Sequence, residues 1–302
     1  MMEELKRFLQ EHNFTDVRFN ELLAKYTSFE VGGKAKVLIT PDSKKQIISL
    51  VKFLYQHKIP FKVLGNGSNI LISDNDYDGV IIKTNKALNY MSLDNETVVI
   101  GCGYSLVKLA YKMIDYELAG CEFLGGIPGT IGGAVYMNAG AYNREMKDIV
   151  EKVELINNHG ELVTYYNDDL QYSYRNSILQ TKKPLLIIEA TLKLQKGEKA
   201  EINRLLDNRR LRRMQTQPLK YPSCGSTFRN PEGTNAYLLI DKAGLRGYQI
   251  GGAKVSDKHC NFIINFNNAK SNDIKNLIDY VIKIVNQTSG ISLQPEVEFF
   301  NW

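Results

Sequence analysis

Residues 125–140 read GGIPGTIGGAVYMNAG, and this stretch says more about the fold than any other part of the chain. Six of these sixteen residues are glycine, whereas 23 glycines in 302 residues would place about one there. Glycine loses more conformational entropy on folding than any other residue, so such a run indicates backbone that must approach a neighbour closely. Pro128 fixes one φ angle and therefore predicts a shaped loop.

A second glycine-rich turn, Gly65-Asn66-Gly67-Ser68-Asn69, follows a predicted strand upstream of this run. Consecutive backbone N–H groups in such a turn can converge on phosphate oxygens. The turn lacks the Gly-Lys-Ser/Thr ending of a P-loop, and it lacks the third glycine and later acidic residue of a dinucleotide fingerprint. Together the two glycine-rich segments predict two backbone-lined walls around one large phosphate-bearing ligand.

Composition is typical of a globular protein, with 43% hydrophobic and 24% charged residues in 302. A chain of this length has room for two or three domains. No apolar run approaches the roughly 20 residues that span a bilayer. The N-terminal segment predicts a short amphipathic helix with Leu5, Phe8 and Leu9 on one face, and it lacks the apolar stretch of a secretory signal. We therefore expect a cytoplasmic protein without a membrane partner.

Metal and nucleic-acid chemistry are not indicated. The chain has only four histidines, and its four cysteines are scattered without a Cys-x-x-Cys spacing, which predicts buried free thiols and no metal site. The net charge of +5 is modest. Its sharpest cluster, residues 209–213 (RRLRR), fits either a solvated helix face or an anionic ligand. Nucleic acid is not expected as a partner, because aromatic residues do not interleave with the basic ones.

The order of predicted elements indicates an α+β fold of small strands and packed helices rather than a regular βαβ series. Ser43 is expected to cap one helix, and the glycine run is expected to be a loop. The charged segment from Gly197 to Met214 is expected to lead into a C-terminal domain. Strands are expected at 36–39, 61–64, 80–83, 97–101, 150–156, 161–165, 185–194 and 260–264, and helices at 43–57, 105–116, 197–214, 234–243 and 272–287.

Both glycine-rich segments, together with residues 27–33 (TSFEVGG), resemble the FAD-contacting segments of the UDP-N-acetylenolpyruvoylglucosamine reductase family. Residues 174–177 (YRNS), 225–231 (GSTFRNP) and 293–297 (LQPEV) are similar to further motifs of that family, in the same order. The resemblance runs from about Tyr26 to Phe299. It implies a two-part FAD-binding domain of the p-cresol methylhydroxylase and vanillyl-alcohol oxidase type at residues 1–80 and 81–197, followed by a smaller α+β substrate-binding domain at 198–302.

The resemblance also implies an activity and its cofactors. NADPH reduces FAD, and the enolpyruvyl group of UDP-N-acetylenolpyruvoylglucosamine is then reduced to give UDP-N-acetylmuramate for peptidoglycan. The FAD-binding positions that it implies are Gly65, Asn66, Gly67, Ser68, Asn69, Gly125, Gly126, Ile127, Pro128, Gly129, Thr130, Gly132, Gly133, Asn138 and Gly140.

Three residues are implied to be catalytic. Arg175 matches the arginine that holds the enolpyruvyl carboxylate, a task suited to a guanidinium fork. Ser226 matches the proton donor, and no Ser-His-Asp pattern nearby indicates a hydrolytic nucleophile. Glu296 matches the carboxylate that stabilises the enol or carboxylate region. In a strand Glu296 and Glu298 would point to the same face, so only the motif selects Glu296.

The implied substrate-binding residues are Tyr174, Arg175, Lys220 and Asn230, whereas His259 is expected to be structural. Little sequence separates Arg175 from the predicted strand at 185–194, so the chain resembles the shorter type of this reductase, which lacks a tyrosine-bearing loop over the substrate. A monomer acting on a small molecule is expected. Two alternatives remain: a sugar or alcohol oxidase on the same FAD domain, and a basic nucleotide- or RNA-binding module.

Overall fold

The computed structural model describes residues 2–302. The first two helices in the chain, α1 (Met2–Glu11) and α2 (Lys44–Gln56), pack together. The Ser43 side chain accepts a hydrogen bond from the Gln46 amide, which confirms the predicted cap of α2. Phe8 of α1 stacks on Phe53 of α2 with ring centroids 4.1 Å apart. The buried face of α2 contains Ile47, Leu50, Val51 and Leu54.

Packing divides the chain into two compact units. The first contains the chain up to Asn20 and the segments Lys36–Gly65 and Asp78–Arg210. The second contains Glu21–Ala35, Asn66–Tyr77 and Leu211–Trp302. Two short N-terminal segments therefore pack with the C-terminal part of the chain. The predicted domain boundaries at residues 80 and 197 stay predictions.

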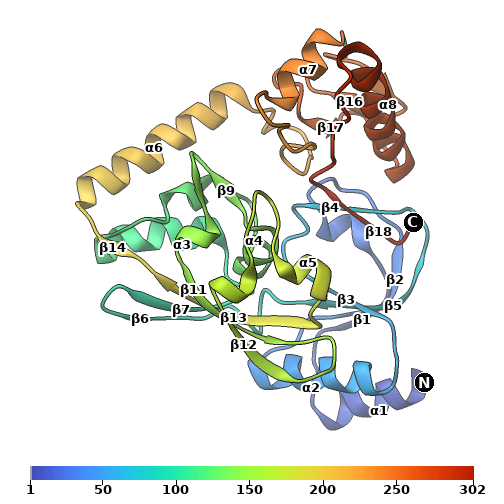
Figure 1. Cartoon of the computed structure of the whole chain (residues 1–302). Coiled ribbons are helices and arrows are strands. Elements are labelled where there is room, and N and C mark those ends of the chain that lie inside the picture. Colours follow the sequence, from blue (N-terminus) through green and yellow to red (C-terminus); the bar gives the residue numbers. More distant parts are fainter. Residues whose placement is uncertain (1) are drawn as a thin grey trace. The chain divides into compact units, whose positions relative to one another are not determined.

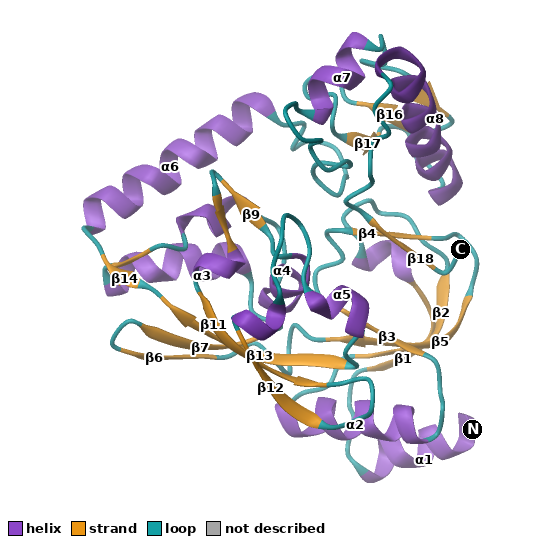
Figure 2. Ribbon diagram, viewed as in Figure 1, coloured by secondary structure: helices purple, strands orange, loops and turns teal. Residues whose placement is uncertain are grey.

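Two sheets form the frame of the first unit (Figures 1 and 2). The larger is a five-stranded antiparallel sheet on which helix α4 packs, next to the central strand β13. The four-stranded sheet has the order β1 (Val17–Leu22), β2 (Lys34–Ile39), β5 (Tyr77–Lys83), β3 (Phe61–Leu64), and the five-stranded sheet has the order β12 (Leu162–Tyr166), β11 (Val150–Ile156), β13 (Leu186–Lys193), β7 (Thr97–Gly101), β6 (Met91–Asp94).

Short elements complete the first unit. They are the helices α3 (Leu106–Lys112), α4 (Ile131–Met137) and α5 (Ile178–Lys182), the paired strands β8 (Leu118–Ala119) and β14 (Gln195–Lys196), the hairpin of β9 (Gly140–Ala141) and β10 (Arg144–Glu145), and the 3₁₀ turns η2 (Met113–Tyr116), η3 (Glu122–Gly126), η4 (Met146–Asp148) and η5 (Asp168–Leu170). The 3₁₀ turn η1 (Leu23–Tyr26) belongs to the second unit. The division between the units falls within helix α6 (Lys199–Thr216).

The glycine run is not the continuous loop that the sequence predicts. Its first residues end the 3₁₀ turn η3, and residues 131–137 form helix α4. Ile131, Ala134 and Val135 are buried at helical spacing, which explains why a helix forms despite two glycines in its first turn. The helix ends at Asn138, whose backbone is left-handed with φ 46°.

The second unit packs helices α7 (Ala236–Lys242) and α8 (Ser271–Ser289) with a three-stranded sheet (Figure 1). That sheet has the order β15 (Gln249–Ile250), β16 (Ala253–Val255), β17 (Ile263–Asn265), so the strand predicted at 260–264 begins later than expected. Strand β18 (Glu298–Phe300) pairs in parallel with β4 (Ile70–Ile72). Within residues 2–302, none of the helices has the length and apolar character needed to cross a membrane.

Candidate active site

The two glycine-rich segments meet at Gly65 and Thr130. A Cβ atom added to Gly65 would lie 2.5 Å from the Thr130 Oγ1 atom and 3.2 Å from its Cγ2 atom. Thr130 itself is buried. The almost fully buried Lys83 side chain donates a hydrogen bond to the Gly65 carbonyl. The two segments therefore lie in direct contact at this point, which leaves no room for a side chain at position 65.

The rest of the Gly65–Asn69 turn fits an anion. Gly67 has φ +64°, and a Cβ there would collide with the Tyr26 carbonyl oxygen. Within residues 2–302, the amide N–H groups of Gly67 and Ser68 donate to no protein acceptor. The buried Ser28 Oγ atom also lacks a partner among these residues, and the Ser28 amide donates to the Gly67 carbonyl. Unpaired backbone donors beside an unpaired buried hydroxyl suit the diphosphate of FAD.

At three glycines of the 125–140 run, protein atoms fill the space that a Cβ atom would occupy, and their predicted contact with FAD stays a prediction. A Cβ on Gly125 would collide with the Leu206 side chain, a Cβ on Gly132 would lie 3.0 Å from the Cys102 Cβ atom, and a Cβ on Gly140 would collide with the Arg144 carbonyl oxygen. Gly133 differs, because its nearest neighbour is the Thr130 Oγ1 atom at 3.8 Å. The density of glycines thus reflects close packing at three positions and open space at Gly133.

Arg175 lies in a tight turn with a left-handed backbone, φ 55°. The turn is closed by two hydrogen bonds between Ser173 and Asn176, of 3.1 and 3.0 Å. The Gln180 side chain also donates to the Arg175 carbonyl at 3.1 Å. A left-handed backbone at a residue other than glycine costs of order 1 kcal/mol or more and is found preferentially at functional sites.

The Arg175 side chain is 16% exposed and is held from two directions. Its Nη2 atom donates to the Gly140 carbonyl at 2.7 Å, and its Nη1 atom lies 3.6 Å from Glu145 Oε1. Tyr174 places its ring 4.9 Å from the Arg175 Cζ atom. Sequence reasoning selected Arg175 and Tyr174 but missed Glu145, which no motif signalled.

Asn138, predicted to contact FAD, has a fully buried side chain that is committed to protein partners. Its Nδ2 atom donates to Glu145 Oε2 at 3.0 Å and to the Ser173 carbonyl at 2.9 Å. Its Oδ1 atom accepts from the Lys147 amide at 3.0 Å. Only the backbone of Asn138 is left for a cofactor, and its side chain supports the Arg175 turn instead.

In the second unit, Ser226 and Glu296 lie on neighbouring segments although 70 residues separate them in sequence. The Glu296 amide donates to the Thr227 carbonyl at 2.8 Å, and the Arg229 amide donates to the Gln294 carbonyl at 2.9 Å. Asn69, the last residue of the first glycine turn, donates from Nδ2 to the Glu296 carbonyl at 3.1 Å. Glu296 precedes strand β18, so it does not share a strand face with Glu298 as the sequence had allowed.

The segment that carries Ser226 is anchored by Asn261, a second residue that sequence reasoning missed. The buried Asn261 side chain binds both the amide and the carbonyl of Phe228, each at 2.9 Å. The Asn261 carbonyl accepts from the Thr227 amide at 2.7 Å. Ser226 itself is exposed. The backbone on the C-terminal side of the hydroxyl is therefore fixed while the hydroxyl stays accessible.

The negative charge of the Glu296 carboxylate acts on the thiol of its neighbour Cys224. Burial, and then the Glu296 carboxylate, raise the pKa of the Cys224 thiol, so it stays neutral. All four cysteines are buried free thiols, as predicted. Burial lowers the pKa of His259, whose ring packs against Phe262 with centroids 4.9 Å apart, in keeping with a structural role. No group of three His, Cys, Asp or Glu side chains within residues 2–302 is arranged to hold a metal.

The remaining predicted substrate residues lie at the surface of the second unit. Lys220 is exposed. Asn230 is exposed too, and its Oδ1 atom accepts from the Ala236 amide at the start of α7 at 3.0 Å. Their contact with substrate stays a prediction.

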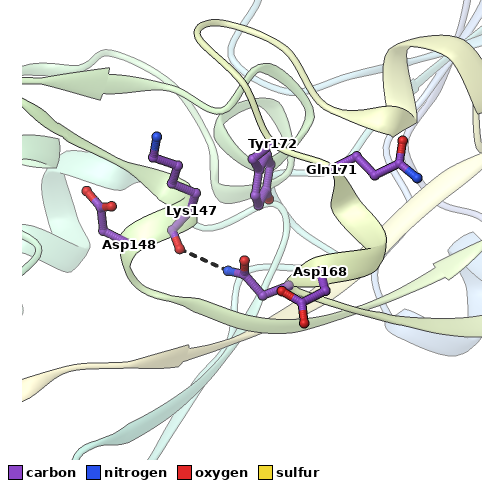
Figure 3. A pocket seen from close by; sticks show the side chains of 6 residues that line it. Lys147, Asp148, Asp168, Gln171 and Tyr172 are labelled. Atoms are coloured by element: carbon purple, nitrogen blue, oxygen red, sulfur yellow. Dashed lines mark hydrogen bonds between the residues drawn. The ribbon is translucent and has the colours of Figure 1, made fainter.

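A separate pocket of about 410 Å³ lies between the 3₁₀ turns η4 and η5 (Figure 3). The Asn167 side chain donates across it to the Lys147 carbonyl at 2.9 Å. None of the predicted site residues lines it, and two aspartates face one lysine there, which does not suit an anionic substrate. The residues that line it are Lys147, Asp148, Asn167, Asp168, Gln171 and Tyr172.

Comparison with known proteins defines the class of protein first. A family model described as an FAD binding domain matches residues 35–166. A second model, the C-terminal domain of UDP-N-acetylenolpyruvoylglucosamine reductase, matches residues 217–300. The chain is therefore an FAD-dependent oxidoreductase, and the predicted fold class, an α+β FAD-binding domain followed by a smaller α+β domain, is confirmed.

Relatives along the whole chain then define the family. A UDP-N-acetylenolpyruvoylglucosamine reductase of Caldanaerobacter subterraneus is 43% identical over 298 residues, which cover 99% of this chain and 97% of the relative. One of Bacillus subtilis is 40% identical over 297 residues, covering 98% of each. The crystal structure of the Thermus caldophilus enzyme superposes with a TM-score of 0.80 at 33% identity, covering 95% of this chain and 100% of that one. The chain belongs to the UDP-N-acetylenolpyruvoylglucosamine reductase family.

Proposed function

We propose that this protein reduces the enolpyruvyl group of UDP-N-acetylenolpyruvoylglucosamine to give UDP-N-acetylmuramate in peptidoglycan precursor synthesis, with FAD as cofactor and NADPH as reductant. The relatives' names support the reaction. The observation that carries the residue assignment is the hydrogen bond from the Glu296 amide to the Thr227 carbonyl. It brings the two residues assigned to protonation onto adjacent segments. We also propose that the protein acts as a cytoplasmic monomer.

The cofactor would be held mainly by backbone. The free amides of Gly67 and Ser68 would bind its diphosphate, and the open space beside Gly133 would admit part of it without a side-chain collision. When bound, FAD accepts a hydride from NADPH and supplies it to the terminal carbon of the enolpyruvyl group.

Arg175 would hold the substrate carboxylate. Two of its donor nitrogens already face Gly140 and Glu145, which fixes the guanidinium plane before substrate arrives. A fixed guanidinium stabilises the negative charge that develops when hydride adds to the conjugated double bond. Tyr174 would extend this wall of the substrate site, and Lys220 and Asn230 would bind the remainder of the nucleotide sugar.

Ser226 would deliver the proton to the carbon that bears the carboxylate, and Glu296 would stabilise the enol form before that transfer. A hydroxyl is a weak acid near neutral pH, so this role requires tight positioning beside charge. The clamp of Asn261 on Phe228 and the bond from Glu296 to Thr227 supply that positioning. Hydride and proton together convert the double bond into a single bond, and NADPH becomes NADP⁺.

A simple preparation tests the proposal. The purified protein should be yellow, should release flavin on denaturation, and should consume NADPH catalytically, beyond the amount that reduces its own flavin, only when the enolpyruvyl substrate is present. A protein that binds flavin yet consumes NADPH equally well with UDP-N-acetylglucosamine, which lacks the enolpyruvyl group, would contradict the assigned reaction. A colourless protein that FAD cannot reconstitute would contradict the cofactor.

A further inference from the structure

Glu145 occupies the centre of a partly buried charge network around Arg175. Its side chain is 15% exposed, and its two oxygens face different partners. Oε1 lies 3.6 Å from Arg175 Nη1, whereas Oε2 accepts from Asn138 Nδ2 at 3.0 Å and lies 3.1 Å from Lys147 Nζ. One carboxylate therefore contacts the guanidinium and the buried amide that supports its turn.

The backbone holds Glu145 in this place independently of Arg175. Glu145 pairs with Gly140 across the β9–β10 hairpin, whose turn residues Tyr142 and Asn143 both have positive φ. The Glu145 amide donates to Asp148 Oδ2 at 2.8 Å. A residue fixed by its hairpin can orient a longer, more flexible side chain such as that of Arg175.

The same hairpin supplies the other contact with the guanidinium, because Gly140 opposite Glu145 accepts from Arg175 Nη2 at 2.7 Å. Asn138 meanwhile binds the Ser173 carbonyl, two residues before Arg175. The Arg175 side chain and the turn that carries it therefore both contact residues 138–145. With Lys147 included, the Glu145 carboxylate faces two cations.

We propose that Glu145 is a positioning residue that orients the Arg175 guanidinium for the substrate carboxylate. This inference rests on the proposed role of Arg175 in carboxylate binding. Glu145 does not touch substrate in this account. It fixes the plane of the guanidinium, and a defined plane is what allows an arginine to meet a carboxylate in two parallel hydrogen bonds, the geometry that gives arginine its advantage over lysine.

The test compares two ligands that differ in the carboxylate. Oxidised, FAD-loaded enzyme is titrated without NADPH with UDP-N-acetylenolpyruvoylglucosamine and with UDP-N-acetylglucosamine, and flavin absorbance reports binding. For Glu145→Ala we expect the preference for the carboxylate-bearing ligand to fall about tenfold or more, with affinity for UDP-N-acetylglucosamine within twofold of wild type. Glu145→Gln, which keeps shape and acceptor, should recover part of the preference.

Kinetics and a matched control complete the design. Flavin reduction by NADPH should stay within twofold of wild type in both variants, while reoxidation by substrate slows about 10- to 100-fold in Glu145→Ala. Glu189→Gln is the control, because Glu189 is a partly buried carboxylate of the same unit paired with Lys44 at 2.8 Å. Should Glu145→Ala fail to fold, Glu145→Gln carries the test.

An unchanged ligand preference in Glu145→Ala, or an equal loss in Glu189→Gln, would overturn the positioning role. Failure of the proposed function looks different, because the wild-type enzyme would then show no preference for the carboxylate-bearing ligand. An Arg175→Lys variant that keeps full preference would likewise point to the function rather than to Glu145.

Discussion

The two regions that carry the proposed catalytic residues are built in opposite ways. Around Arg175, side chains hold one another: Glu145 faces Arg175, Asn138 and Lys147 both contact Glu145, and the buried Asn138 amide donates two hydrogen bonds and accepts one. Around Ser226 and Glu296, the groups that are held are backbone groups: the Glu296 amide donates to the Thr227 carbonyl, the Asn261 side chain binds the Phe228 backbone, and the Ser226 side chain is exposed.

This difference matches the two tasks. Recognition of a carboxylate depends on the direction of a guanidinium fork, which a preformed network fixes before substrate binds. Proton delivery by a hydroxyl needs an accessible oxygen at a fixed point, which a clamped backbone provides with a short side chain. Changes in the first region should therefore alter binding and orientation, whereas changes in the second should alter the chemical step.

The largest effect is expected for Ser226→Ala, which removes the proton donor. Reoxidation of reduced flavin by substrate should slow by about 10²- to 10⁴-fold, while flavin reduction by NADPH stays fast. Stopped-flow absorbance measures both half-reactions, and Ser223→Ala in the same segment is the control. Normal turnover of Ser226→Ala would show that this serine takes no part in the mechanism. The proposed contrast between the two regions would then fail as well.

The next largest effect is expected for Arg175→Lys. Its kcat/KM for the UDP-sugar should be reduced about 10²- to 10³-fold, because a point charge cannot replace a bidentate fork. Steady-state kinetics measures this loss. Arg144→Lys, at a partly exposed arginine of the β9–β10 hairpin, should retain wild-type activity. An unchanged kcat/KM for Arg175→Lys would show that Arg175 lies outside the substrate site.

The pH dependence of stability should reveal the buried Lys83 ammonium, which donates to the Gly65 carbonyl in the same unit as Arg175. Burial lowers the pKa of Lys83 to about 8 from 10.5, so between these values the unfolded state binds more protons and stability rises with pH. In denaturant titrations of the apoprotein, wild type should gain about 3 kcal/mol across this window relative to Lys83→Met. Parallel pH profiles for the two proteins would show that the Lys83 ammonium is not desolvated.

The smallest effects concern two glycines with different surroundings. Gly65→Ala should destabilise the apoprotein by about 1–3 kcal/mol, because its Cβ would press on Thr130. Gly133→Ala should leave the apoprotein as stable or up to about 1 kcal/mol more stable, since space is open there and alanine favours a helix. FAD titration should nevertheless show weaker binding to Gly133→Ala. Unchanged FAD affinity would place the cofactor elsewhere.

Local signals in the sequence predicted local structure well. Ser43 before a helical apolar pattern gave the cap of α2, and the strand predicted at 61–64 corresponds to β3. Motif order also selected Arg175, Ser226 and Glu296 before any contact was known. The cap and the strand were predictable because each depends on residues close together in the chain, whereas the roles of the three motif residues stay predictions.

Long-range packing was not predictable in the same way. Glu145 lies 30 residues before Arg175, and the hairpin register that pairs Glu145 with Gly140 leaves no motif. The glycine run misled in part, because Gly125, Gly132 and Gly140 make room for protein neighbours that composition cannot name. The segment Asn66–Tyr77 packs with the C-terminal unit for a similar reason, through pairing of β4 with β18.

An anaerobic stopped-flow record of flavin absorbance tests the central claim most directly. On mixing with NADPH the wild-type protein should bleach, and on later mixing with UDP-N-acetylenolpyruvoylglucosamine its flavin absorbance should return without oxygen. Absorbance that returns only when oxygen is admitted would contradict the account and favour an oxidase on the same FAD-binding domain.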